Sequence, residues 1–336
     1  MQSRVLRNDS ARQKSILIIA AFLAIYVFWG STYLAIKYAI ESMPPFLMAA
    51  SRFLIAGTIL FIWGRLSKDY ERPTFTHWRT TAIAGTLLLL GGNGGVVLAE
   101  RYIPSSLAAL LIATEPFWIV ILSWLWLKGK RPNWKVVLGL VIGFAGVWLL
   151  ISGNIKDGGG LGLGSEQLVG TIAMIVASVS WAMGSIYGLR ASVPKSSLLT
   201  AGMQMMSGGS ALMLLGLVRG EWRSLDIATV SLNSWLGLGY LIVFGSLISF
   251  TAYSWLLKNA QPSMVATYAY VNPVIAVVLG WLIAGESMTG QLLLGAGVIV
   301  GSLVLITMQD KAKDLEGEIE VHRSVGPNRP AATCST

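Results

Sequence analysis

The chain contains a succession of apolar runs, each about as long as a membrane is thick. A hydrocarbon core of about 30 Å requires roughly 20 apolar residues in one helix. The sequence is 54% hydrophobic and only 12% charged, whereas an average soluble domain has about 25% charged residues. We therefore predict an all-α membrane protein with ten transmembrane helices. They are expected at residues 15–36, 45–64, 80–100, 104–127, 134–153, 167–189, 199–218, 234–257, 262–284 and 290–308.

One motif occurs twice, within the fourth and the ninth of these spans. A polar residue is followed by a proline and, eight residues after the proline, by a tryptophan. The second copy lies 157 positions after the first, which indicates an internal duplication. The copies are Glu115, Pro116 and Trp124, and then Asn272, Pro273 and Trp281.

The distribution of basic residues predicts the orientation, because loops rich in Lys and Arg remain in the cytoplasm. With the N-terminus inside, 19 of the 25 basic residues fall on the cytoplasmic side and Arg52 falls within a span. Both termini are then predicted to be cytoplasmic. The five basic residues left on the outer side are Lys37, Arg101, Lys156, Arg219 and Arg223.

Five spans in each half is an odd number, so a duplicated half must cross the membrane in the opposite direction. The loop after the Pro116 helix carries four basic residues between Lys128 and Lys135, whereas the equivalent loop around Glu286 has none. Such opposite bias is expected of inverted repeats. The predicted parts are a cytoplasmic segment 1–14, a first repeat 15–153, a glycine-rich linker 154–166, a second repeat 167–308 and a disordered cytoplasmic tail 309–336.

These motifs resemble those of the EamA family of the drug/metabolite transporter superfamily. The second half carries Asn272, Pro273, Gly285 and Glu286 in the family's order, while the first half has Lys130 where the family usually has an acid. The resemblance covers roughly residues 16–308. It implies ten helices in two inverted five-helix repeats and a bacterial inner-membrane exporter of small metabolites with a central cavity.

The two prolines interrupt helical hydrogen bonding within their spans. A carbonyl left free at membrane depth must be satisfied by protein or by a wet cavity. One interpretation is therefore a central substrate cavity, with Pro116 and Pro273 as flexible hinges. The alternative is a packing kink whose free carbonyl accepts a neighbouring hydroxyl.

Glu115 lies about eleven residues, or roughly 16 Å, below the outer surface. An acid near the midplane is a candidate proton carrier or an anchor for a substrate amine. The structural alternative is a buried ion pair with Arg52, which is expected at a similar depth. The two roles do not exclude one another.

Aromatic and amide side chains on helical stripes supply further candidates for substrate binding. Asn93 lies among four glycines, where a ligand could approach the backbone closely. The alternative for the aromatic residues is packing or an interfacial belt. Together they would suit an amphipathic cargo. With Glu115, the candidates are Trp29, Tyr33, Asn93, Trp118, Trp181, Tyr253, Tyr268 and Asn272.

The sequence lacks the motifs that would indicate another class of protein, such as an enzyme or an ATP-driven pump. His77 and His322 have no metal-ligand or nucleophile pattern around them, and there is no phosphate-binding loop for ATP. We predict a secondary transporter that works by alternating access, is not an enzyme, needs no cofactor, binds no nucleic acid and functions as a monomer. A membrane sensor, an assembly protein or an intramembrane enzyme is the alternative, and proton coupling, facilitated export and exchange all remain open.

Overall fold

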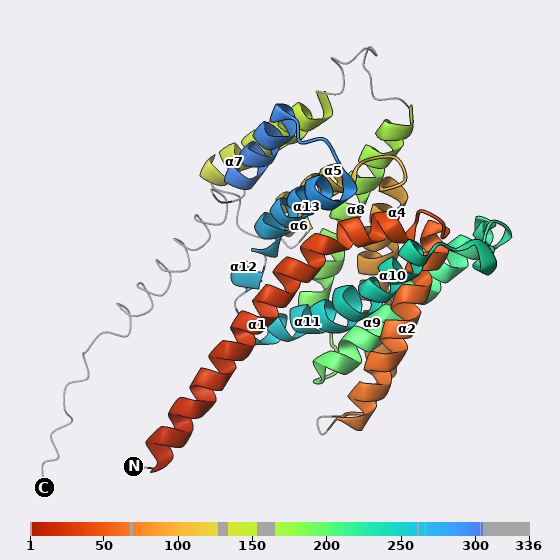
Figure 1. Ribbon diagram of the computed structural model, residues 1–336. Coiled ribbons are helices and arrows are strands. Elements are labelled where there is room, and N and C mark those ends of the chain that lie inside the picture. The colour runs from red at the N-terminus through yellow and green to blue at the C-terminus, as the bar shows by residue number, and fades with distance from the viewer. Residues whose placement is uncertain are drawn as a thin grey trace, which may run out of the picture.

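The computed structural model describes residues 2–67, 70–126, 134–152, 165–260, 262–265, 267–302 and 304. The linker predicted at 154–166 lies almost entirely outside the described residues, and the tail predicted at 309–336 lies wholly outside them. Within the described part the chain is helical, and its helices form ten successive spans (Figure 1). The predicted fold class is confirmed.

The first five spans follow the predicted order, with some divided into shorter helical elements. The third span contains a π-helical segment, η1, between α3 and α4. The fourth span is broken between α5 and α6. The bounds are α1 Gln2–Ala39, α2 Pro45–Leu66, α3 Phe75–Gly85, η1 Thr86–Asn93, α4 Gly94–Ala99, α5 Ser105–Ile112, α6 Glu115–Trp126 and α7 Trp134–Ser152.

The second five spans repeat this organisation. The eighth span again contains a π-helical segment, η5, and the ninth is again divided. The bounds are α8 Ser165–Arg190, α9 Ser197–Val218, the short 3-10 turns η3 Glu221–Arg223 and η4 Ile227–Thr229, α10 Leu232–Tyr240, η5 Leu241–Ile248, α11 Ser249–Asn259, α12 Pro262–Val265, α13 Tyr268–Ala284 and a last helix Gly290–Ser302.

Seven of the described helical stretches are long and apolar enough to cross a membrane unaided. The first of them is Lys14–Ala39, which is the apolar part of α1. Large side chains such as Trp63, Trp134 and Trp148 are exposed on the outside of the bundle. An exposed apolar belt of this kind suits lipid contact rather than water.

Contacts between the halves are reciprocal. Helix α1 packs against α10, η5 and α11, and its counterpart α8 packs against α3, η1 and α4. Helix α1 also contacts α13, while α8 contacts α5 and α6. The second and seventh spans, α2 and α9, pack against each other, as do α5 and α13. Each half therefore uses the same faces towards the other, which is the pattern of two repeats related by a two-fold axis.

Close packing of α2 on α9 depends on glycine. A Cβ atom added at Gly57 would lie 2.8 Å from the backbone nitrogen of Met206, and one at Gly202 would lie 2.6 Å from that of Phe61. Small residues at such crossings let membrane helices approach closely. Gly146 of α7 likewise packs against Val298 of the last helix, and these two helices lie side by side in Figure 1.

Acidic side chains complete the symmetry at helix starts. Glu221, after α9, accepts hydrogen bonds from the backbone nitrogens of Phe46 and Leu47 at the start of α2, both at 3.0 Å. Glu71, after α2, accepts one at 2.9 Å from the backbone nitrogen of Lys195, just before α9. Free amides at a helix start favour a carboxylate. An acid of each repeat thus bonds the chain near the start of the other repeat's second helix, but only Glu221 bonds amides of the helix itself, since Lys195 precedes the N-cap residue Ser196.

Candidate functional site

An aromatic cluster lies at the centre of the helix bundle. Trp29 of α1 contacts the rings of Trp181, Tyr253 and Tyr268 at centroid distances of 5.9, 5.1 and 5.2 Å. Its indole nitrogen donates to the Gly245 carbonyl in η5 at 3.1 Å. Because these residues come from both repeats, a movement of one repeat against the other must rearrange this cluster.

Glu115 lies beside this cluster and is only 5% exposed. The Tyr268 hydroxyl hydrogen-bonds to the carboxylate, with distances of 2.9 Å to Oε2 and 3.1 Å to Oε1. Glu115 begins α6, where the free amides of a helix N-terminus favour negative charge. The acid of the first repeat is therefore held by a tyrosine of the second.

Pro116 occupies the first turn of α6, where a missing N–H costs little. The span is interrupted just before it, since α5 ends at Ile112. In the break, the Thr114 hydroxyl donates to the Leu111 carbonyl at 2.7 Å. The Leu111 carbonyl also accepts from the Thr114 amide at 3.1 Å, so this hydroxyl adds to a turn that closes the end of α5.

Arg52 of α2 is only 4% exposed. Its Nε donates to the Ser246 hydroxyl at 2.8 Å, and its guanidinium carbon lies 4.6 Å from the centre of the Phe53 ring. Although Arg52 and Glu115 are both within the described part of the chain, they form no ion pair with each other. The expected alternative of a Glu115–Arg52 pair is not found in this conformation.

Asn272 differs from its counterpart Glu115 in what it binds. With its amide oriented so that both ends are satisfied, the nitrogen donates to the carbonyls of Tyr26 at 3.1 Å and of Ile25 and Tyr268 at 3.3 Å. It thereby ties α13 to the backbone of α1. Pro273 follows it inside α13, whereas Pro116 stands at a helix start.

A central pocket brings many of these residues together, with a cavity volume of about 70 Å³. Since a buried water needs about 10–15 Å³, the cavity has room for a few waters but is small for an organic solute. Both Glu115 and Arg52 line it without pairing. The sequence candidates among its lining residues are Trp29, Tyr33, Asn93, Glu115, Trp181, Tyr268 and Asn272, with Arg52 and Pro273.

Two candidates lie elsewhere. Trp118 packs against Phe144 of α7, with ring centres 5.6 Å apart, and does not line the pocket. Tyr253 stands behind Trp29 and Tyr268 as part of the supporting cluster. Trp118 was predicted as one of the aromatic substrate-binding candidates, but its ring packs against α7.

The pocket is also lined by residues that carry no polar signal in the sequence and were not predicted, among them Phe250, Val96 and Gly245. Gly245 belongs to η5, and Asn93 ends the equivalent segment η1. π-Helical turns leave main-chain groups free and occur frequently at functional sites. Side chains supply partners for them: Ser180 donates to the Leu87 carbonyl at 2.7 Å, as Trp29 does to Gly245.

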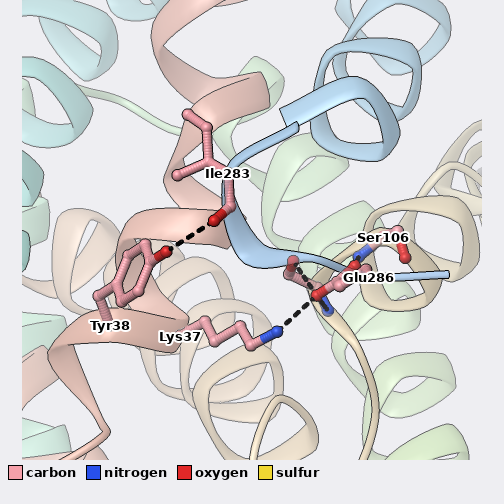
Figure 2. Close-up of polar contacts among 6 residues, drawn as sticks. Lys37, Tyr38, Ser106, Ile283 and Glu286 are labelled. Atoms are coloured by element: carbon pink, nitrogen blue, oxygen red, sulfur yellow. Dashed lines mark hydrogen bonds and ion pairs between the residues drawn. The ribbon is translucent and has the colours of Figure 1, made fainter. Parts of the chain in front are cut away.

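A second polar cluster was also missed, at the end of the bundle formed by loops 40–44, 100–104, 219–231 and 285–289, here called the predicted outer end. Glu286 Oε1 accepts from the Lys37 ammonium at 2.9 Å and from the amide and hydroxyl of Ser105 at 3.0 and 2.7 Å (Figure 2). Its Oε2 accepts from the Ser106 amide at 3.1 Å. We call these four residues the Glu286 latch.

The latch acid and its buried neighbour Glu100 have opposite pKa shifts. Burial alone would raise the pKa of Glu286, but hydrogen bonds from Ser106, Lys37 and Ser105 together lower it to about 2. Burial, and then the nearby charge of Glu286, raise the pKa of Glu100 well above its usual value, although Lys37 opposes this. Glu286 therefore carries charge at neutral pH, while Glu100 favours its protonated form.

The fold and the central pocket define a multi-pass membrane protein with two interlocked repeats and an internal polar site. The sequence profile of the EamA-like transporter family matches residues 16–152 and again residues 168–308. The chain belongs to this family and is a membrane transporter with two EamA domains.

Individual relatives support the same family assignment. The chain is 37% identical over 293 residues to the "Uncharacterized inner membrane transporter YedA" of Escherichia coli (strain K12), covering 87% of this chain and 90% of that protein. It is 28% identical over 299 residues to the "Uncharacterized transporter YvbV" of Bacillus subtilis (strain 168), covering 88% and 92%. By this similarity it is a multi-pass protein of the inner membrane. A solved crystal structure 21% identical superposes with a TM-score of 0.62 over 88% of this chain and 98% of that chain, so the fold is shared.

Proposed function

We propose that this protein is a secondary transporter that exports small metabolites, either amino acids or amphipathic organic compounds, by alternating access. The observation that carries the proposal is the central pocket, where Glu115 and Arg52 stand unpaired among aromatic side chains contributed by both repeats. Buried charges at membrane depth are costly and are retained where they act on a solute or a proton.

The two charges favour a zwitterionic substrate. Glu115 would take an ammonium group and Arg52 a carboxylate, for which guanidinium geometry is suited. Trp29 and Trp181 would contact the apolar part of the solute. Since the pocket is small as it stands, binding requires the repeats to separate on one side, as alternating access provides.

Counterflow in proteoliposomes tests the proposal. Vesicles loaded with one unlabelled solute at a time are given its radiolabelled form, using neutral amino acids in one set and amphipathic amines in the other. We expect the transporter to exchange at least one set and empty vesicles to exchange neither. Absence of counterflow for both sets would contradict the proposed substrate classes.

Substitution of Arg52 distinguishes the two substrate classes, amino acids and amphipathic amines. Arg52→Lys keeps the charge but loses the planar fork, so the half-saturating concentration for an amino acid should rise about tenfold. An amine without a carboxylate should be unaffected. Arg65→Lys is the matched control, because Arg65 lies exposed at the end of the same helix. Equal effects of Arg52→Lys on both classes would argue against a carboxylate site.

The orientation is part of the proposal, with both termini in the cytoplasm, and so is function as a monomer. The basic residues of the loops support the orientation. Cys334 is the one cysteine of the sequence and gives a direct test. A membrane-impermeant maleimide should leave it unlabelled in intact cells and label it after permeabilisation, whereas labelling of intact cells would reverse the topology. Mass measurement in nanodiscs tests the monomer.

A further inference from the structure

The Glu286 latch joins the two repeats at the predicted outer end. Glu286 follows α13 in the second repeat, while Lys37 ends α1, and Ser105 and Ser106 begin α5 in the first repeat. Tyr38, beside Lys37, adds a weak contact at 3.4 Å to the carbonyl of Ile283 (Figure 2). Four donors on one carboxylate make this a strong and directional connection.

The latch lies next to one end of the central pocket. Ile36 and Val96 line the pocket, and they precede Lys37 by one residue and Glu100 by four. Helix α5, which starts at the latch, leads to the break before Glu115. In alternating access, a contact that joins the repeats on one side of the site must release when that side opens.

Glu100 is a buried titratable group that the proposed transport site does not use. It is only 8% exposed, and neither carboxylate oxygen has a hydrogen-bond partner in the described part of the chain. Burying such a group without a partner is costly and calls for an explanation. Glu100 also lines a surface pocket together with Lys37, whose side chain is 38% exposed.

The charged and titratable groups around Glu100 come from three places. Helix α1 and the turn after it present Tyr33, Lys37 and Glu41, the loop after α13 presents Glu286, and Arg101 is its own neighbour in the chain. Helix α8 approaches this corner through Gly170, which has no side chain. Among these groups, Lys37 is the flexible cation that both Glu100 and Glu286 attract.

We propose that Glu100 is a second proton-binding site of the transporter and that its proton controls the Glu286 latch. When Glu100 is protonated, Lys37 stays on Glu286 and the predicted outer end is closed. When Glu100 releases its proton to water, the new carboxylate draws Lys37 away and the latch opens. The proposal rests on the proposed function, because it assigns an outer gate to a transporter.

The direction of the effect suits export driven by protons. A proton bound from outside would close the outer gate and send the carrier back towards the cytoplasm. Tyr33 is close enough to interact electrostatically with both Glu100 and Glu115. Tyr33 also lines the central pocket with Glu115, so the surroundings of the two acids adjoin.

The test measures opening of the outer gate directly. Val96→Cys, in a Cys334→Ser background, places a reporter in the pocket, and a membrane-impermeant maleimide added outside labels it when the gate opens. Ser224→Cys, exposed on loop 219–231, corrects for the effect of pH on thiol reactivity. The ratio of the two labelling rates should rise at least about fivefold between about pH 6 and about pH 9, the usual size of a coupling between sites.

Three variants test whether Glu100 and the Glu286 latch cause this pH dependence of the labelling ratio. Glu100→Gln should hold the ratio low at both pH values, and Glu286→Gln should hold it high at both. Glu41→Gln, which alters an exposed acid of the same surface pocket, should respond as the unmodified transporter does. A Glu100→Gln variant that keeps the full pH response would overturn the proposal, as would a flat response of the unmodified protein.

If Glu100→Gln does not fold, Lys37→Met tests the transfer of Lys37 between the two acids instead. Without the cation there is nothing to transfer, so the ratio should be high and independent of pH, and a retained pH response would contradict the mechanism. The assay needs no substrate. If counterflow fails but the labelling ratio still responds to pH as expected, the proposed function alone is rejected. If counterflow occurs but Glu100→Gln keeps the full pH response of the labelling ratio, only this inference is rejected.

Discussion

The fourth and ninth spans carry the same polar-proline motif, yet the fold uses them differently. In the fourth span the helix ends at Ile112 and restarts at Glu115, so Pro116 lies in a first turn. In the ninth the interruption comes before Tyr268, and Pro273 stays within a continuous helix. An identical spacing in sequence therefore gives a break at the motif in one repeat and a break before it in the other.

The polar residues differ in the same way. Asn272 donates to the backbone of α1 and so holds two helices together. Among the described residues, the Glu115 side chain is hydrogen-bonded only by the hydroxyl of Tyr268, and it lines the central pocket. An amide can donate to carbonyls without carrying charge, whereas a carboxylate has no hydrogen to donate to them. We infer that the first repeat supplies the proton chemistry and the second supplies the rigid half of the site.

Glu115→Gln should have the largest effect. The amide keeps the size of the side chain but removes the titrating group, so we expect loss of most of the pH dependence of transport in reconstituted vesicles, leaving only the part that comes from the outer gate. Thermal stability should change little, because within the described part of the chain the Glu115 side chain is hydrogen-bonded by Tyr268 alone. An unchanged pH profile would remove Glu115 as the coupling group and would erase the functional difference between the two spans.

Tyr268→Phe should come next. It deletes the donor to Glu115, and loss of a hydrogen bond to a charged group costs about 1.5–3 kcal/mol, so transport should fall by about tenfold or more. Tyr253→Phe is the matched control, since Tyr253 packs on the same Trp29 ring without bonding Glu115. Equal losses in both variants would show that the aromatic cluster matters rather than the bond.

Asn272→Ala should affect stability rather than coupling. Removing the amide that ties α13 to α1 should lower the free energy of unfolding by about 1 kcal/mol, seen as a lower melting temperature. The pH dependence of any remaining transport should stay. If Asn272→Ala instead flattened the pH profile at unchanged stability, the proposed division of roles would be reversed.

The sequence predicts the ten spans and the duplication because both are local patterns, long apolar runs and a motif repeated at a fixed offset. It could not place Trp118, since α6 is apolar on nearly every side and its sequence does not tell which face meets a neighbour. The bond between Lys37 and Glu286 joins positions 249 residues apart. In the sequence, Lys37 is noticeable only as one of the five basic residues on the predicted outer side, and no periodic pattern connects it to Glu286.

The smallest expected effect compares two acids of the second repeat, Glu286 and Glu221, each of which binds backbone amides at the start of a helix of the first repeat. The pKa of Glu286 is lowered to about 2, so its contribution to stability is present above its ordinary pKa of 4.5 and is lost as pH falls towards 2. Burial raises the pKa of Glu221 despite hydrogen bonds from Leu47 and Phe46, so its contribution is present at low pH and declines as pH rises through the raised value.

Melting temperature against pH in nanodiscs separates these two contributions. Glu286→Gln should reduce the loss of stability on the acid side, and Glu221→Gln should reduce the decline at higher pH. Each effect should be modest, since both side chains are partly reached by water. If both variants changed the same limb of the curve, the two acids would be electrostatically equivalent, although they hold the starts of different helices, α2 and α5.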